Sequence, residues 1–342
     1  MTTSAPERSA GAGGPGGVTA LGVDIGGTKV LGVALGPDGR VIAEAREPTP
    51  HPEGDGASLA YDVADAVARV VADLSSTVGV TGGPVGVGAP GMVDRGGVLV
   101  FSPNLPPVSG APLRRLVAAR LAGSVLVVEN DANCAARAEL ELGSVRGVDE
   151  ALVVTLGTGI GGGLISGGRV VSGSGGFAGE IGHMVVDPSG PPCPCGRRGC
   201  WERFASGGGL GRLAREAAHG GGLPVVVELA GGDPESVRGE HVTAAARDGD
   251  RGALAVLGQL GWWVALGLAN LVAVVDPSHI VLGGGLAGAG ELLLAPTRRA
   301  FADLVEGGSR RPAIEILPAA LGERAGAVGA ALWARSAAEA DG

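Results

Sequence analysis

The chain has 342 residues, of which 45% are hydrophobic and 18% are charged, and its formal net charge is −9. This length suits two moderate domains better than one small core. The acidic balance argues against nucleic acid or an anionic membrane surface as the main partner, and we expect neither.

The N-terminal segment, residues 1–17, is rich in Gly, Ala, Pro and Ser and holds no apolar run of the kind that a secretory signal needs. We therefore expect a disordered tail. Alternating apolar residues then predict a strand, a Gly-Gly turn and a returning strand between residues 18 and 35. Further along, we expect strands at 40–47 and 84–88 and helices at 57–74 and 112–121.

The middle of the chain repeats the layout of residues 18–35. A buried strand at 125–128 runs into a helix that begins within ENDANC, and a strand, a glycine turn (TGIGGG) and a returning strand follow from residue 151. We interpret the repeated layout as an internal duplication. We expect further helices near 206–218, 252–275 and 325–340, the second of them buried because its apolar run is too short to span a bilayer. A strand is also expected at 279–283. Alternating strands and helices predict a mixed α/β sheet in each half.

Three glycine-rich turns follow predicted strands. Glycine lets the backbone approach a phosphate without a Cβ clash, and a neighbouring Thr adds a hydroxyl donor. The first two turns could hold a triphosphate between them, and the third could pack against adenine or ribose. With 66 glycines in the chain, plain hairpins are the alternative, and Lys29 could simply face solvent. The candidate nucleotide-binding residues are Asp24, Gly26, Gly27, Thr28, Lys29, Gly157, Thr158, Gly159, Gly283 and Gly284.

The segment GEIGHMVVDPSGPPCPCGRRGCWE, residues 179–202, holds one histidine and three cysteines. This is the ligand set of a closed tetrahedral zinc site, which would be structural because no coordination position stays open. Glu180 and Glu202 stand among these residues and suit the hydroxyl groups of a polyhydroxylated small molecule. A disulfide with one thiol left over and a DNA-binding zinc ribbon are weaker alternatives, and the cysteine pattern suits a reducing cytoplasm. The predicted zinc ligands are His183, Cys193, Cys195 and Cys200.

These motifs, in this order, resemble those of the ROK family of bacterial sugar kinases, within the hexokinase, actin and Hsp70 superfamily. The resemblance covers the chain from about residue 18 to its end and rests on DIGGTK, ENDAN, LGTGIGGG, EIGH and CPCGRRGCWE. It implies a two-domain actin-like ATPase fold (ribonuclease H-like) with mixed sheets and a cleft between the domains. The expected division is a tail at 1–17, a small domain at 18–128 plus 325–342, and a large domain at 129–324.

The resemblance also implies an ATP-dependent hexose kinase that uses Mg²⁺, with glucose as the expected sugar. Asp131 would be the general base for the sugar 6-hydroxyl, kept ionised by the dipole of its helix. Asp24 would lie near the magnesium and the phosphates. The enzyme would be cytoplasmic and a homo-oligomer, either a dimer or a tetramer. The expected sugar contacts are Asn104, Asn130, Asp131, Glu180, His183 and Glu202.

Several alternatives stay open at this point. Nothing in the motifs excludes mannose, fructose, allose or an N-acetylhexosamine. A polyphosphate-dependent kinase is disfavoured because no basic track is evident in the sequence. The family also includes transcription regulators, but the 17 residues before the first strand leave no room for a DNA-reading helix. A catalytically silent sugar sensor is disfavoured by the presence of Asp131.

Overall fold

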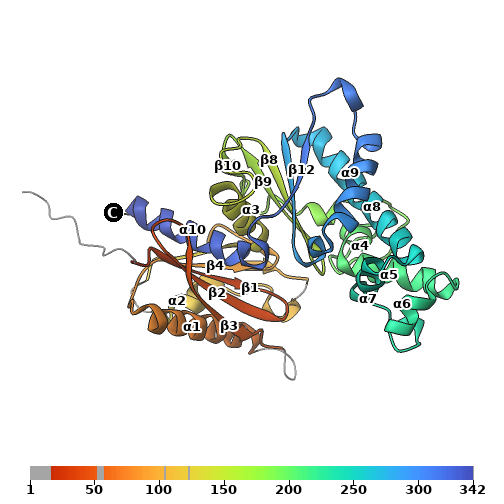
Figure 1. Cartoon of the computed structure of the whole chain (residues 1–342). Coiled ribbons are helices and arrows are strands. Elements are labelled where there is room, and N and C mark those ends of the chain that lie inside the picture. Colours follow the sequence, from red (N-terminus) through yellow and green to blue (C-terminus); the bar gives the residue numbers. More distant parts are fainter. Residues whose placement is uncertain (1–16, 52–57, 104, 122–123, 342) are drawn as a thin grey trace, which may run out of the picture.

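The computed structural model describes residues 17–51, 58–103, 105–121 and 124–341. Residues 1–16 of the predicted tail, and Asn104, lie outside these described residues. Two five-stranded sheets organise the chain, one in each half, and Figure 1 shows them with the helices grouped around them.

The first sheet has the strand order β3-β2-β1-β4-β7. The predicted hairpin is confirmed, because β1 pairs antiparallel with β2, while β4 pairs parallel with both β1 and β7. A short two-stranded sheet, not predicted, follows β4. These strands are β1 (Ala20–Ile25), β2 (Lys29–Leu35), β3 (Val41–Pro48), β4 (Val85–Ala89), β5 (Met92–Val93), β6 (Leu99–Phe101) and β7 (Leu126–Asn130).

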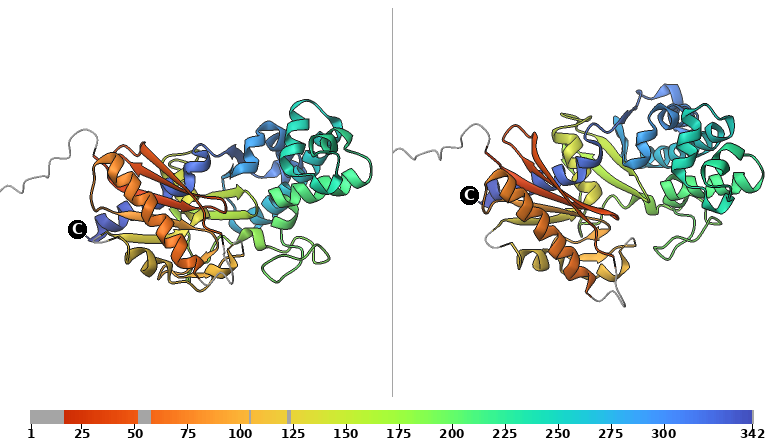
Figure 2. Two further views of the ribbon diagram at one scale, coloured as in Figure 1. Left: turned by 90° about the horizontal axis from the view of Figure 1, so that it is seen from below. Right: turned by 60° about the horizontal axis from the view of Figure 1, so that its bottom comes forward.

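Alternate side chains of β2 face opposite sides of this sheet. Val30 and Ala34 pack towards α1 (Leu59–Val78), whereas Leu31 and Val33 pack towards α10 (Ala325–Asp341). The closing helix α10 therefore returns to the first sheet, and Figures 1 and 2 show the C-terminus beside the first strands. The short helix α2 (Leu113–Ala118) lies over α1, and it is shorter than the helix predicted at 112–121.

Glycines let α10 lie directly on the sheet. A Cβ at Gly22 would be 1.9 Å from the carbonyl oxygen of Ala327, and one at Gly86 would be 1.8 Å from that of Ala330. Either distance is far below van der Waals contact, so only glycine fits there. This close approach brings α10 within reach of the end of β1, where Asp24 lies.

The second sheet repeats the first, with the order β10-β9-β8-β11-β12. The antiparallel pair β8 and β9 corresponds to β1 and β2, and the parallel neighbours β11 and β12 correspond to β4 and β7. The predicted duplication of layout is confirmed. The strand β12 was not predicted from the sequence. The strands are β8 (Ala151–Leu156), β9 (Ile160–Ser166), β10 (Arg169–Val170), β11 (His279–Gly283) and β12 (Glu315–Pro318).

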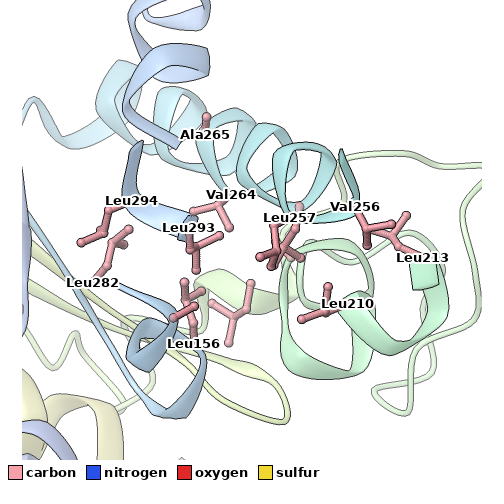
Figure 3. Close-up of a cluster of buried hydrophobic side chains, with 14 of the residues drawn as sticks. Leu156, Leu210, Leu213, Val256, Leu257, Val264, Ala265, Leu282, Leu293 and Leu294 are labelled. Atoms are coloured by element: carbon pink, nitrogen blue, oxygen red, sulfur yellow. The ribbon is translucent and has the colours of Figure 1, made fainter. Parts of the chain in front are cut away.

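A layer of helices covers one face of the second sheet. Its centre is α8, predicted as a buried helix, whose apolar side chains interdigitate with those of α5, α9 and the strands, as Figure 3 shows. By length and composition α8 could cross a membrane, but 56% of its most apolar stretch is buried inside the protein. The helices are α4 (Glu202–Ala205), α5 (Gly207–His219), α6 (Pro224–Leu229), α7 (Gly239–Arg247), α8 (Arg251–Val275) and α9 (Glu291–Leu304).

The helix α3 (Asp131–Glu141) lies between the two sheets. It packs along α10 and also contacts β8 and β9. The chain passes from the first half to the second through residues 142–150, and it returns through residues 319–324. The exact domain boundaries given above stay a prediction.

Candidate functional site

A cavity of about 450 Å³ lies between the two halves. Its lining comes from the first glycine turn, the loops after β4 and β6, the start of α3, the second glycine turn and the segment around 179–202. Twelve of the residues predicted to bind sugar or nucleotide line it, so the fold gathers motifs that are far apart in the sequence. They are Gly26, Gly27, Thr28, Asn130, Asp131, Gly157, Thr158, Gly159, Glu180, His183, Glu202 and Gly284.

Asp131 begins α3 at the floor of this cavity. The preceding Asn130 caps the helix, because its side-chain oxygen accepts a hydrogen bond from the backbone N–H of Asn133 at 2.9 Å. Its amide nitrogen donates to the carbonyl of Gly91 at 2.9 Å. These two bonds fix the side chain of Asn130 and leave it one N–H for a ligand.

The carboxylate of Asp131 experiences two opposed effects. Burial disfavours its charge, while the backbone N–H of Ala132, 2.8 Å from Oδ1, favours it. Burial dominates and raises the pKa of Asp131 from 3.8 to about 6. The group is still ionised at neutral pH, as predicted, but its pKa moves in the direction opposite to that expected from the helix dipole.

Asp24, at the end of β1, lies behind the first glycine turn rather than on the cavity wall. Burial, followed by the nearby charge of Asp131, raises the pKa of Asp24 to about 7, and Lys29 partly offsets this. Its Oδ1 is buried and has no hydrogen-bond partner among the described residues. A buried, unpaired carboxylate oxygen beside a second acid is suited to a cation or to a water held by one.

Two further acids and a histidine form the opposite wall. Glu180 Oε2 is 3.9 Å from Nε2 of His183, and Glu202 Oε1 is 3.6 Å from Nδ1 of the same ring. Burial is the main cause that raises the pKa of Glu180 to about 7, with the charges of Asp131 and Glu202 adding to it. The cavity therefore carries acidic oxygens on both sides, and these can accept hydrogen bonds from hydroxyl groups.

The four predicted zinc ligands meet at one point. Their ligand atoms lie within 4.8 Å of one another, with Cys193 Sγ 3.7 Å from Nδ1 of His183 and Cys195 Sγ 3.6 Å from Cys200 Sγ. A tetrahedral site with Zn–S bonds of about 2.3 Å separates its sulfur atoms by about 3.8 Å. The donor set and its spacing thus fit zinc. All four cysteines are free thiols, which removes the disulfide alternative.

Trp201 anchors this cluster to the helical layer. It follows Cys200 directly, is fully buried, and its Nε1 donates to the carbonyl of Trp263 on α8 at 2.7 Å. The next residue, Glu202, begins α4 and lies on the cavity wall. Three consecutive residues therefore join the ligand cluster (Cys200), the hydrophobic core (Trp201) and the cavity wall (Glu202).

The second glycine turn is shorter than predicted. Only residues 157–159 form it, and Gly161, Gly162 and Gly163 belong to β9. Glycine is needed in that strand because a Cβ at Gly163 would lie 2.3 Å from Cβ of Ala136 on α3, and one at Gly162 2.3 Å from Ile181. These strand glycines thus let α3 and Ile181 pack closely against β9.

The N-terminus of α5 lies beside this turn. The backbone N–H of Gly207 donates to the carbonyl of Gly157 at 2.8 Å, and Ser206 caps the helix through Gly209. These two bonds occupy the N–H groups of Gly207 and Gly209, and the positive end of the helix dipole next to a glycine turn still favours a bound anion. This helix N-terminus was not predicted from the sequence to be part of the site.

A second cavity of about 730 Å³ opens from the same turn. It shares Gly157 and Thr158 with the first cavity, and all its lining residues lie between 157 and 289, in the second half of the chain. No sequence pattern predicted this cavity, because its polar residues lie on or next to ordinary amphipathic helices. They are Arg215, Arg238, Glu240, Thr243 and Arg247.

Some predicted residues lie elsewhere. Lys29 forms an ion pair with Glu323, just before α10, and does not line either cavity. Gly283 ends β11 without reaching the cavity wall. Conversely, Gly91 lines the cavity and was missed. It has φ +107° and lies against the carbonyl of Phe101, and its only sequence signal was the Pro-Gly pair after β4.

The comparisons with known proteins point to one family. A model described as "ROK family" matches residues 20–337. The chain is 39% identical to a glucokinase of Streptomyces coelicolor over 319 residues, which are 92% of this chain and 97% of the relative. It is 36% identical to a glucokinase of Thermotoga maritima over 312 residues, 91% and 95% of the two chains.

A solved structure supports the same conclusion. A ROK family glucokinase from Streptomyces griseus, in complex with glucose and AMPPNP, superposes with a TM-score of 0.83 at 40% identity, over 94% of this chain and all of that one. The predicted actin-like ATPase fold is confirmed.

Proposed function

The chain belongs to the ROK family, and from this premise we propose that it is an ATP-dependent glucokinase that converts glucose to glucose 6-phosphate. The observation that carries the proposal is the 450 Å³ cavity, where Asp131 at the start of α3 faces both glycine turns and the acids of the opposite wall. The similarity to glucokinases over more than nine-tenths of the chain supports glucose as the sugar.

In the proposed reaction Asp131 accepts the proton of the sugar 6-hydroxyl as the oxygen attacks the γ-phosphorus of ATP. The new O–P bond replaces the bond to the β-phosphate oxygen, and ADP leaves. Phosphoryl transfer depends mainly on positioning and charge stabilisation, so a base contributes one part of the rate. A pKa of about 6 leaves Asp131 ionised at neutral pH and still basic enough to take the proton.

ATP is proposed to lie across both cavities. The two glycine turns and the N-terminus of α5 offer backbone N–H groups for its phosphates, and the second cavity accommodates its nucleoside. Mg²⁺ bound with ATP would neutralise the charge of the phosphates. The unpaired oxygen of Asp24 supports a position for this ion next to Asp24. Lys29 stays a predicted nucleotide contact, and it can bind the nucleotide only after its ion pair with Glu323 breaks.

The sugar hydroxyls are proposed to bind Asn130, Glu180, His183 and Glu202, with Asn104 as a further predicted contact. Zinc held by the His-Cys₃ cluster is proposed to be structural, fixing the ring of His183 through Nδ1 and leaving Nε2 for the sugar. This arrangement would make the shape of the sugar site depend on the metal.

We further propose a cytoplasmic homo-oligomer, a dimer or a tetramer. Exposed apolar side chains on α8, with Trp262 41% and Val274 80% exposed, support burial against a second copy. Light scattering on the purified protein tests this assembly.

The substrate assignment is tested by a coupled assay with ATP, Mg²⁺ and a panel of glucose, mannose, fructose, allose and N-acetylmannosamine. We expect glucose to give the highest kcat/KM. If glucose is among the poorest substrates, glucose as the assigned substrate is overturned, whereas the assignment of kinase activity stands. A parallel arm with polyphosphate in place of ATP tests the donor, because three arginines line the second cavity. Turnover with polyphosphate but none with ATP would overturn ATP as the phosphoryl donor.

A further inference from the structure

Glu139, on α3, is a fully buried carboxylate that the proposed reaction does not use. Its two oxygens accept three backbone hydrogen bonds. Oε2 accepts from the N–H of Ser144 at 2.8 Å and of Ala320 at 3.1 Å, and Oε1 accepts from the N–H of Leu321 at 2.9 Å. Among the described residues no lysine, arginine or histidine pairs with it, so backbone amides alone hold this buried side chain.

The three amides belong to the two segments that join the halves of the protein. Ser144 lies in residues 142–150, which lead from α3 to β8, and the other two lie in residues 319–324, which lead from β12 to α10. Ser144 also bonds to the end of β12, because its hydroxyl donates to the carbonyl of Pro318, the residue just before the second segment, at 2.7 Å. Glu139 therefore ties together both passages of the chain between the sheets.

A carboxylate that accepts several backbone N–H bonds in a buried site makes a strong and directional tie. Residues that absorb a domain rotation lie where few connections cross between the moving parts. A side chain that fixes both crossings at one point defines where such a rotation pivots. A cap serving α3 alone would not reach residues 320 and 321, which are about 180 positions further along the chain.

We propose that Glu139 is a positioning residue, the pivot about which the two halves close on the sugar. This inference rests on the proposed kinase function. The sugar cavity is lined by both halves, whereas the second cavity is lined by the second half alone. Loosening the pivot should therefore weaken closure on the sugar and slow transfer. Binding of the nucleotide to the sugar-free protein should change little, because only the first glycine turn, among the groups proposed to hold the nucleotide, belongs to the first half.

The test variant is Glu139→Gln, which keeps the shape of the side chain but replaces one acceptor oxygen by an N–H₂ group. Because bonds to a charged acceptor are the stronger kind, we expect kcat/KM for glucose to fall about tenfold or more. The Kd for Mg-AMPPNP without sugar should stay within about twofold of wild type. In small-angle X-ray scattering, glucose with AMPPNP should compact the wild type and compact the variant less.

Glu141→Gln is the matched control. Glu141 lies on the same helix and pairs with Arg137 at 2.8 Å and with Arg335 of α10 at 3.1 Å, and among the described residues its carboxylate makes no hydrogen bond to either crossing segment. This variant should lower the melting temperature and leave compaction and kcat/KM near the wild-type values. A Glu139→Gln variant that loses only stability, with wild-type kcat/KM and compaction, would overturn the pivot.

Glu139→Asp keeps the test decisive if Glu139→Gln does not fold. It keeps the carboxylate but shortens the side chain by one methylene, so that the carboxylate cannot reach the amides of both segments at once. We expect kcat/KM for glucose to fall about twofold to threefold with nucleotide binding unchanged. Wild-type kcat/KM and compaction in Glu139→Asp would then overturn the proposal. Absence of turnover in the wild type would overturn the kinase function itself, which is a separate outcome of the same assay.

Discussion

The Sγ of Cys193 lies 3.1 Å from Oε1 of Glu202, so that a thiol of the metal-binding cluster touches a carboxylate on the wall of the sugar cavity. The same carboxylate reaches towards the second glycine turn, where a Cβ on Gly159 would meet Oε2 at 2.6 Å. The His-Cys₃ cluster, the wall of the sugar cavity and the second glycine turn thus all contact the side chain of Glu202. A change in the cluster should therefore alter the geometry of the sugar site.

The first prediction concerns this coupling. Cys195→Ser should reduce the zinc content measured by mass spectrometry and should lower kcat/KM for glucose, because Glu202 and His183 lose their anchor. The control Cys134→Ala changes a buried thiol on α3 outside the cluster, and it should keep its zinc. A Cys195→Ser protein without zinc but with wild-type activity would contradict the proposed role of the metal.

The second prediction concerns pH. Burial raises the pKa of Asp131 to about 6, and the base acts only when it is ionised. The pH dependence of kcat/KM reports pKa values of the free enzyme. The kcat/KM for glucose should therefore be constant above about pH 7 and fall about tenfold for each pH unit below pH 6. A profile that stays flat down to pH 5 would mean that no group with this pKa is needed in its ionised form.

The third prediction separates stability from activity at the same residue. The pKa of Asp131 is 3.8 ordinarily and about 6 in the folded protein, so the folded state binds more protons between these values and stability falls as pH rises through that window. Above pH 7 the folded protein bears the full free-energy cost of burying the ionised carboxylate of Asp131. Asp131→Asn should thus stabilise the fold by about 1–3 kcal/mol at pH 7.5. Urea unfolding at pH 5 and 7.5 measures this, and a variant less stable than wild type at pH 7.5 would contradict the burial argument.

The fourth prediction compares two glycines of α8. A Cβ at Gly258 meets no atom within 4 Å, so Gly258→Ala should raise the free energy of unfolding by roughly 0.5–1 kcal/mol. A Cβ at Gly267 would lie 2.0 Å from the ring of Trp201, so Gly267→Ala should lower it by about 1–3 kcal/mol. Denaturant unfolding compares the two, and equal effects would show that Trp201 does not pack as described.

Much of the site could be predicted from the sequence because its motifs are local. The turn at Gly26, the helix start at Asp131 and the cluster around Cys193 each combine special residue types within a few positions. The repeated layout of strand, glycine turn and strand was also predicted, since each hairpin alternates apolar residues around a glycine turn. These features need no knowledge of distant contacts.

The features that the sequence did not reveal depend on tertiary contacts. The second cavity is walled by arginines such as Arg215, whose spacing looks like that of any solvent-facing helix side. Glu139 lies in an Ala-rich helix, and only the fold brings its carboxylate to the amides of residues 320 and 321. The raised pKa of Asp131 likewise follows from burial between two halves, which opposes the local helix dipole.

The most direct test of the account compares wild type and Asp131→Ala for transfer from ATP to glucose, with glucose binding measured by calorimetry on the same preparations. We predict rapid formation of glucose 6-phosphate by the wild type, a loss of about 10²–10⁴-fold in kcat in the variant, and glucose binding largely retained. An Asp131→Ala protein that turns over near the wild-type rate would contradict Asp131 as the base. A wild-type protein that is folded and zinc-loaded but phosphorylates no sugar would contradict the kinase itself.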